Sequence, residues 1–319
     1  MLLFSKVVKV VVQHAGICFM IYKFYRRQNG NPWPLYFLCW LSSIWRVFCQ
    51  HAGGHRYFAH KSFRCTPIFA TLMALTICVS DVGTFYYWVF FHNDHHTHCD
   101  KGRDLHSPKY NGLWTVQFRL VRDEEDRSGK LKDECGPNAP PSKTLKTKYD
   151  ADLSWITVPV SFGLIVAESI FWMLIAIPLG FHVADLLLWI CLVPRLFSMH
   201  IISTTNSFSH VYGDRPYCGN GRAPYADCMA TNNVWVALVG GGEGWHNNHH
   251  AFALSSRHGM LWYEFDWCWL LLRLLAELGL VWDMIEVADE VRLAKRDPSV
   301  MMQFENKYIV RYKREEKKV

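Results

Sequence analysis

The chain has 319 residues, of which 50% are hydrophobic and 15% aromatic, with fourteen tryptophans. This composition is too apolar for an ordinary soluble domain and indicates an integral membrane protein. The formal net charge of +6 is modest, and because the basic residues are spread along the loops we expect no nucleic-acid partner.

Four stretches could each cross a bilayer, which takes ~20 apolar residues. A fifth apolar stretch, 66–91, is interrupted by Asp81 and Gly83. It joins two groups of histidines, and a crossing would put these groups on opposite sides of the membrane. We therefore expect this stretch to be a helix in or under the interface. The four expected spans run from about residues 7 to 25, 35 to 52, 153 to 179 and 183 to 205.

With four spans, both termini and the 53–152 loop share one side, which holds nearly all of the Lys and Arg residues. Positive charge marks the cytosolic side, so the histidine groups and both termini should be cytosolic. Residues 122–150 are charged and contain proline, and we expect an exposed loop that is either a plain linker or a regulatory segment. The basic tail, about 292–319, would lie near an anionic leaflet. Its Lys317 and Lys318 stand close to, but not at, the spacing of a signal for retrieval to the endoplasmic reticulum.

The eleven cysteines are odd in number and include no C-x-x-C pair. Such a set does not look like a disulfide framework. We expect reduced thiols in the membrane helices and on the cytosolic face, and a single membrane domain over residues 1–319.

Most of the sixteen histidines are clustered. HNDHH and HNNHH share the form H-x-x-H-H, and the spacing i, i+3, i+4 puts the three imidazoles of each on one face of a helix. HRYFAH has the spacing i, i+5, which does not stack on an α-helix, and Gly53 and Gly54 before it predict that the helix ends or is distorted there. The cluster members are His55, His60, His92, His95, His96, His246, His249 and His250, and NSFSH adds His210.

Nine imidazoles close together would pack poorly in a hydrophobic core but could bind metal ions well, because neutral imidazole is the commonest nitrogen ligand. One ion rarely takes more than four to six ligands, so nine suggest two ions. No cysteine is spaced for a structural zinc site. All-nitrogen ligation beside a membrane favours iron and oxygen activation on a lipid, with a structural or hydrolytic zinc site as the alternative. The histidines outside the clusters are expected to be structural: His14, His182, His200 and His258.

Taken in order, HRYFAH, HNDHH and HNNHH resemble the three histidine boxes of the membrane-bound fatty acyl desaturases, and they are most similar to the acyl-CoA Δ9 branch. NSFSH, GDRPY and GEGWHNNHHAF are similar to the same branch, and the resemblance covers about residues 35–285. It implies an all-α integral membrane fold with four transmembrane helices and a cytosolic helical cap that holds a histidine-rich di-iron site.

The resemblance also implies which residues bind the metal. The nine histidines take the places of the ligands, without being allotted to one iron or the other, and Asn206 takes the place of an asparagine that reaches the metal through water. Asn93 and Asp94 stand where a basic residue is common. Four carboxylates could fix the tautomers of the ligands, or could equally be solvated loop residues: Asp94, Glu243, Asp100 and Asp104.

The implied reaction inserts a cis double bond, at Δ9, into a saturated acyl chain carried as fatty acyl-CoA, using O2 and two electrons. No H-P-G-G haem motif occurs, so the electrons would come from a separate cytochrome b5 or ferredoxin. The implied location is the endoplasmic reticulum, among membrane lipid. A lipid hydroxylase on the same scaffold, an acyl-lipid desaturase and an inactive membrane scaffold are the alternatives.

Residues near the boxes suggest a substrate path. Trp88, four before His92, either lines a channel or packs in the core, and Cys39 and Ser43 would close the far end of a tunnel along the second span. Arg46 is costly inside a span, so it should snorkel to the surface or meet a polar head group. His51 either supports His55 or lies at the interface.

Overall fold

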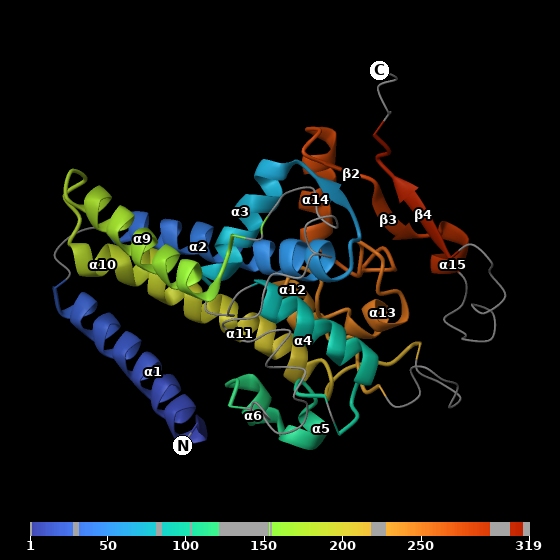
Figure 1. Ribbon diagram of the computed structural model, residues 1–319, viewed down its shortest axis with the longest axis horizontal. Coiled ribbons are helices and arrows are strands. Elements are labelled where there is room, and N and C mark those ends of the chain that lie inside the picture. The colour runs from blue at the N-terminus through green and yellow to red at the C-terminus, as the bar shows by residue number, and fades with distance from the viewer. Residues whose placement is uncertain are drawn as a thin grey trace.

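The structure is a computed structural model that describes residues 2–27, 32–80, 85–102, 104–120, 153, 155–217, 228–293 and 307–314. Within these ranges the chain is mostly helical, with two small sheets (Figure 1). The long helices α1 (Leu2–Arg27), α9 (Val158–Ala176) and α11 (Val193–Phe208) extend toward one side (Figure 1). The short helices α13 (His246–Ala251) and α15 (Asp289–Leu293) gather with the strands on the other side. The expected 122–150 loop and the Lys317–Lys318 pair lie outside the described residues.

Among the residues that the structure describes, three helical segments are long and apolar enough to cross a membrane, which fits a membrane protein. The first lies in α1 (Leu2–Arg27) and the second in α9 (Val158–Ala176), where Phe162, Phe171 and Leu174 are exposed. The third runs unbroken over Val183–Phe208. It comprises α10 (Val183–Leu187), a π-helical segment η2 (Leu188–Leu192) and α11 (Val193–Phe208).

The second expected span corresponds to α2 (Trp33–Phe48), whose 16 residues fall short of a full crossing. Here the backbone changes to a buried π-helix, η1 (Cys49–Ala59), so the helix is distorted near Gly53 and does not end there. Helix α2 packs along α11. A fourth crossing therefore stays a prediction.

The 66–91 stretch is two helices, and the expectation of one interfacial helix is wrong in that respect. Helix α3 (Pro67–Cys78) begins at Thr66, whose side chain accepts a hydrogen bond from the backbone of Phe69. It packs its buried face on η1. Helix α4 (Phe85–His98) starts again after the Asp81–Gly83 interruption and carries HNDHH on its last turns.

Short elements build the rest of the cap. Helices α5 (Pro108–Asn111) and α6 (Leu113–Gln117) follow α4 in the chain, and α6 packs against α11. Helices α12 (Val234–Val239) and α13 (His246–Ala251) flank the glycine-rich GGGEG turn. Helix α14 (Trp267–Glu277) packs against η1.

The mostly helical fold agrees with the expected all-α class, and the cap adds a few short strands to it. Strand β1 (Arg64–Cys65) pairs antiparallel with β2 (Val281–Trp282). Strand β3 (Met284–Val287) pairs antiparallel with β4 (Tyr308–Arg311), and α15 (Asp289–Leu293) follows β3. The region expected as a basic tail thus contains a strand, in which Arg311 is held by ion pairs with Glu286 and Asp289.

Two further expectations from single residues are wrong. Cys99 and Cys228, which are 129 residues apart and buried, are paired as a disulfide, so not every cysteine is a free thiol. Arg46 neither snorkels nor is left for a head group, because its guanidinium pairs with Glu168 of α9 and donates to the carbonyl of Val79 at 2.9 Å. Linear sequence could not show either pairing, since each joins distant segments.

Candidate metal centre

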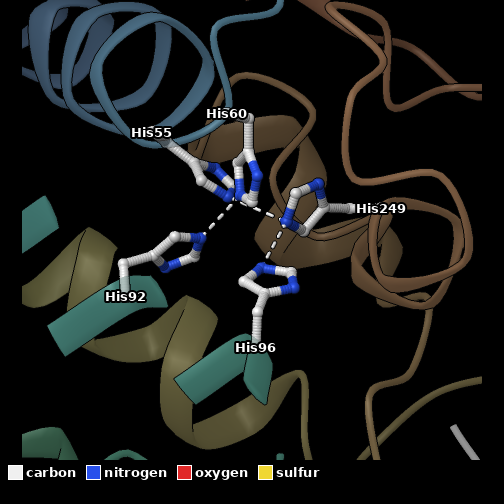
Figure 2. A group of neighbouring side chains, drawn as sticks. All are labelled: His55, His60, His92, His96 and His249. Atoms are coloured by element: carbon white, nitrogen blue, oxygen red, sulfur yellow. Dashed lines mark hydrogen bonds between the residues drawn. The ribbon is translucent and has the colours of Figure 1, made fainter. Parts of the chain in front are cut away.

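Nine histidine side chains from four segments converge inside the cap, and their Nε2 atoms face one another in two groups. Eight of these residues are buried and His96 is half-buried. The first group is drawn from η1 and its end, α4 and α13: His55, His60, His92, His96 and His249 (Figure 2). The second group is drawn from α4, the end of α11 and α13: His95, His210, His246 and His250.

The distances within each group are short. In the first, Nε2 of His249 lies 2.9 Å from Nε2 of both His55 and His96 (Figure 2). The Nε2 atoms of His60 and His92 are 2.8 Å apart.

In the second group, Nε2 of His246 lies 3.1 Å from that of His210 and 3.2 Å from that of His250. Nε2 of His250 is 3.3 Å from that of His95.

Hydrogen bonding between imidazoles does not account for this geometry. The Nε2 atom of His249 faces two other Nε2 atoms, and a single nitrogen cannot satisfy both as donor. Ligands at about 2.1 Å from one metal ion and at right angles to each other lie about 3 Å apart, which is the separation found. The donor set therefore fits a metal ion at each group.

Burial keeps the lone pairs available. It lowers the pKa of eight of the nine histidines, and repulsion between neighbouring rings lowers it further. Burial also acts against a charged His95, but the adjacent Asp104 carboxylate outweighs it and raises the pKa of His95. Neutral imidazoles are the form that binds metal.

Helical geometry explains how each H-x-x-H-H box serves both groups. At 3.6 residues per turn, positions i and i+4 are about 40° apart, whereas i+3 is turned about 60° to the other side. On α4, His92 and His96 accordingly belong to the first group and His95 to the second. On α13 the roles are exchanged: His246 and His250 face the second group, and His249 the first.

The π-helix explains the remaining box. In η1 the backbone bonds run i to i+5, and the N–H of His60 donates to the carbonyl of His55 at 3.1 Å. Residues five apart then lie on the same side of the helix. HRYFAH, which would not stack on an α-helix, presents both imidazoles to the first group (Figure 2).

Three of the four predicted carboxylates lie behind histidines of the two groups. Asp104 accepts from Nδ1 of His95 at 2.8 Å, and Asp100 accepts from Nδ1 of His210 at 2.8 Å. Glu243 contacts Nδ1 of His55. Each contact fixes the ring with Nε2 directed into its group.

Asp94 differs, because the structure places it beside Nδ1 of His98 at 3.2 Å.

Charge balance at Glu243 depends on Arg56. Burial raises the pKa of Glu243, and Arg56, at 3.0 Å from Oε1, opposes that rise. Burial likewise opposes ionisation of Asp104, but His95 holds the pKa of Asp104 well below its usual range. Both carboxylates are buried beside cationic or hydrogen-bonding groups, as buried charges must be.

The other predicted residues are placed as follows. The indole of Trp88 stacks on His92, with ring centroids 4.9 Å apart, so it borders the first group. Asn206 is half-buried on α11, one turn before His210. Ser43 donates to the carbonyl of Cys39 at 2.7 Å within α2. His51 is buried in η1.

Two histidines near the centre were missed. His258, expected to be structural, lies against His249 with ring centroids 4.5 Å apart. His106 lies 5.6 Å from His95 and donates its backbone N–H to Asp104 at 2.8 Å. Neither belongs to a sequence cluster, and only the folding of distant segments brings His258 to the centre.

Known proteins of similar sequence act on acyl chains, by the names they carry. The sequence profile of the family described as fatty acid desaturase matches residues 31–285. An acyl-CoA C20 Delta5-desaturase of Anemone leveillei is 28% identical over 82% of this chain and 77% of its own length. A Delta-9 acyl-lipid desaturase 2 of Arabidopsis thaliana is 28% identical over 79% of the chain and 76% of its own length. A hex-5-enoyl-[acyl-carrier protein] acetylenase of Moorena producens is 29% identical over 73% and 71%.

Proposed function

Since the chain belongs to the fatty acid desaturase family and is an oxidoreductase, we propose that it inserts a cis double bond at Δ9 of a saturated fatty acyl-CoA. The observation that carries the proposal is the division of nine histidines into two groups with ligand-like spacing. Such a division supports two metal ions, and all-nitrogen ligation beside a membrane supports iron.

In this proposal the two groups of histidines hold one iron ion each. By the motif resemblance, Asn206, which lies one turn before His210, would contact the second ion through a water molecule. Bound there, the ions supply the oxidising chemistry that removes two hydrogens from adjacent methylenes while O2 is reduced to water with two external electrons.

The chain's own residues position and isolate this chemistry. Glu243, Asp100 and Asp104 hold three rings from behind, so the lone pairs stay directed inward. The burial of the centre excludes bulk water, which protects reactive species from side reactions. Trp88, which stacks on His92, would border the acyl chain near the reacting carbons.

The Δ9 position and the CoA carrier rest on the motif resemblance alone. Relatives of similar identity differ in the double-bond position in their names, which is Delta5 in one and Delta-9 in another. They also differ in the acyl carrier that is named, which is CoA, a lipid or acyl-carrier protein. An acyl-lipid desaturase is therefore the second candidate. Methylenes are chemically alike, so the position must be set by the distance from head group to metal, and Cys39 and Ser43 on α2 would set chain length.

Charge and the motif resemblance support a proposal for partner and location. A basic cytosolic face would suit an acidic carrier such as cytochrome b5 or ferredoxin. The proposed setting is the endoplasmic reticulum, with four crossings and both termini and the histidine boxes in the cytosol. Against an inactive scaffold stands the presence of all nine histidines together with their supporting carboxylates.

The test is a fatty-acid profile. The full chain is expressed in yeast lacking its own Δ9 desaturase, without unsaturated supplement, and new double bonds are located by mass spectrometry. We expect growth and new cis-Δ9 monoenes, absent with His249→Ala. Double bonds at another carbon would overturn the position, and hydroxylated lipid would overturn the reaction. Analysis of CoA, phospholipid and galactolipid pools after brief labelling identifies the carrier.

A further inference from the structure

His258 lies beyond the established boxes but next to the metal centre. Its side chain is fully buried, and its backbone N–H donates to the carboxylate of Asp266 at 2.8 Å. Its ring is 4.5 Å from that of His249 and 5.3 Å from that of His55, both in the first group. The position is therefore fixed by the backbone while the imidazole faces the histidines.

Polar atoms on two adjacent rings have no hydrogen-bond partner among the described residues. They are both ring nitrogens of His258 and the Nδ1 atom of His249. A buried polar atom left unpaired costs about 1–3 kcal/mol. Three such atoms on neighbouring imidazoles indicate that they pair with one another, or with a nearby group, once the centre is complete.

Glu243 is the nearby acceptor. Its Oε1 atom lies 3.5 Å from Nδ1 of His258, while its other oxygen contacts Nδ1 of His55. Arg56 holds the carboxylate still through Nε at 3.1 Å and Nη2 at 3.0 Å. A fixed carboxylate between two imidazoles can orient both of them.

His55 and His249 also differ in what supports them. The Nδ1 atom of His55 has its carboxylate directly, whereas Nδ1 of His249 faces no carboxylate among the described residues. Imidazoles that bind metal almost always donate their second N–H to an acceptor. His258 is close to both side chains: its ring lies 4.5 Å from that of His249, and its Nδ1 atom lies 3.5 Å from Oε1 of Glu243.

We propose that His258 is a positioning residue that connects Glu243 to His249. In the neutral imidazole, Nδ1–H donates a hydrogen bond to Glu243, and Nε2 accepts a hydrogen bond from Nδ1–H of His249. The Nε2 atom of His249 is then fixed toward the metal. Glu243 thus orients two ligands of the first group, one directly and one through His258. This role rests on the metal centre of the proposed function.

The test compares His258→Leu, which removes both polar atoms, with His258→Gln, which keeps one donor and one acceptor. The full chain is purified in lipid nanodiscs, loaded with 57Fe and dialysed against increasing chelator, and iron per chain is measured. We expect the affinity for iron to be about 10–100-fold lower in His258→Leu and near that of the wild type in His258→Gln. His200→Leu is the matched control, because His200 binds His14 and lies in neither group.

Two further readouts separate positioning from packing. Mössbauer spectra should change for one of the two iron sites in His258→Leu, and the metal-free variants should unfold at the same temperature as wild type. If His258→Leu does not accumulate, His258→Asn, whose amide is too short to span the gap, replaces it.

Equal iron retention in wild type and His258→Leu would overturn the proposal, as would equal loss in the Leu and Gln variants. Wild type that holds no iron would instead overturn the metal centre itself.

Discussion

The carboxylate of Asp104 lies 2.8 Å from Nδ1 of His95, on the side of the ring opposite the Nε2 atom that faces His250. This contact is buried. It decides two properties of His95: the ring carries its proton on Nδ1, and it is the one member of the nine whose pKa is raised.

Replacing Asp104 by Asn should weaken metal binding at the second group. The amide oxygen can still accept a hydrogen bond from Nδ1–H of His95, but it carries no charge, so the bond is weaker and the ligand becomes less basic and less well oriented. We expect about a 10–100-fold loss of affinity for one ion of two, measured as metal per chain under chelator competition. Asp94→Asn is the control, since Asp94 lies beside His98. Equal losses in both variants would show that the Asp104 contact has no special role.

The metal-free protein should become more stable as pH rises from about 4 to 7. Eight histidines of the centre have a lowered pKa, and burial lowers the pKa of His106 to about 3. Below about pH 6.5 these histidines bind protons in the unfolded chain but stay neutral in the folded chain, which favours unfolding. The free energy of unfolding that they contribute is therefore present above that pH and is lost below it. His95, whose pKa is raised, acts in the opposite direction, because the stability that it contributes is lost as pH rises. This one residue is outnumbered by the eight histidines whose pKa is lowered.

Thermal unfolding of the metal-free chain across this pH range checks the sign. His106→Gln removes one titrating group and should flatten the slope slightly. A melting temperature that fell between pH 4 and 7 would contradict the buried neutral state of the histidines.

The boxes show how far sequence reaches. The i, i+3, i+4 spacing correctly predicts that the three imidazoles of each H-x-x-H-H box share one helical face. The same spacing turns position i+4 by about 40° and position i+3 by about 60° to the other side, and this difference separates the two groups. Which group receives His95 and which His92 depends on where α11 and α13 pack, and that is not local. HRYFAH needed a π-helix, which Gly53 and Gly54 indicated only as a distortion.

Long-range pairings were beyond the sequence for the same reason. No sequence motif around His258 predicts its place in the centre. It comes close to Glu243 and His249 only through the turn and helix that precede it. The Arg46–Glu168 pair and the β3–β4 sheet likewise join segments more than 20 residues apart, and no local period predicts them.

Removing Glu168 should destabilise the helix bundle. Its two oxygens serve Arg46 of α2 and Arg195 of α11, the latter at 2.9 Å, and the Arg46 side chain is 3% exposed. Glu168→Leu leaves the buried Arg46 and the half-buried Arg195 without their counter-charge, which costs about 3–5 kcal/mol. Glu168→Gln keeps hydrogen-bond acceptance and should cost less. Chemical unfolding in mild detergent measures both, and a Leu variant as stable as wild type would show that the network is solvated.

The glycine at position 53 should be required for the shape of η1. A Cβ there would lie 2.9 Å from Cβ of Met73, closer than such atoms approach, so either η1 or α3 must move. Because η1 carries His55 and holds His60 at its end, we expect Gly53→Ala to reduce iron retention at the first group as well as stability.

Two other glycines calibrate that result. A Cβ at Gly54 would meet Trp88 at 3.5 Å, an ordinary contact, so Gly54→Ala should have a smaller effect. At Gly163 in α9 nothing lies within 4 Å, and Gly163→Ala should leave iron unchanged while stabilising the helix by up to about 1 kcal/mol. Iron per chain and the unfolding midpoint are measured on all three variants. Both should be highest in Gly163→Ala, lower in Gly54→Ala and lowest in Gly53→Ala. Loss of iron in Gly163→Ala equal to that in Gly53→Ala would mean that the close contact of η1 with α3 does not set the geometry of the first group.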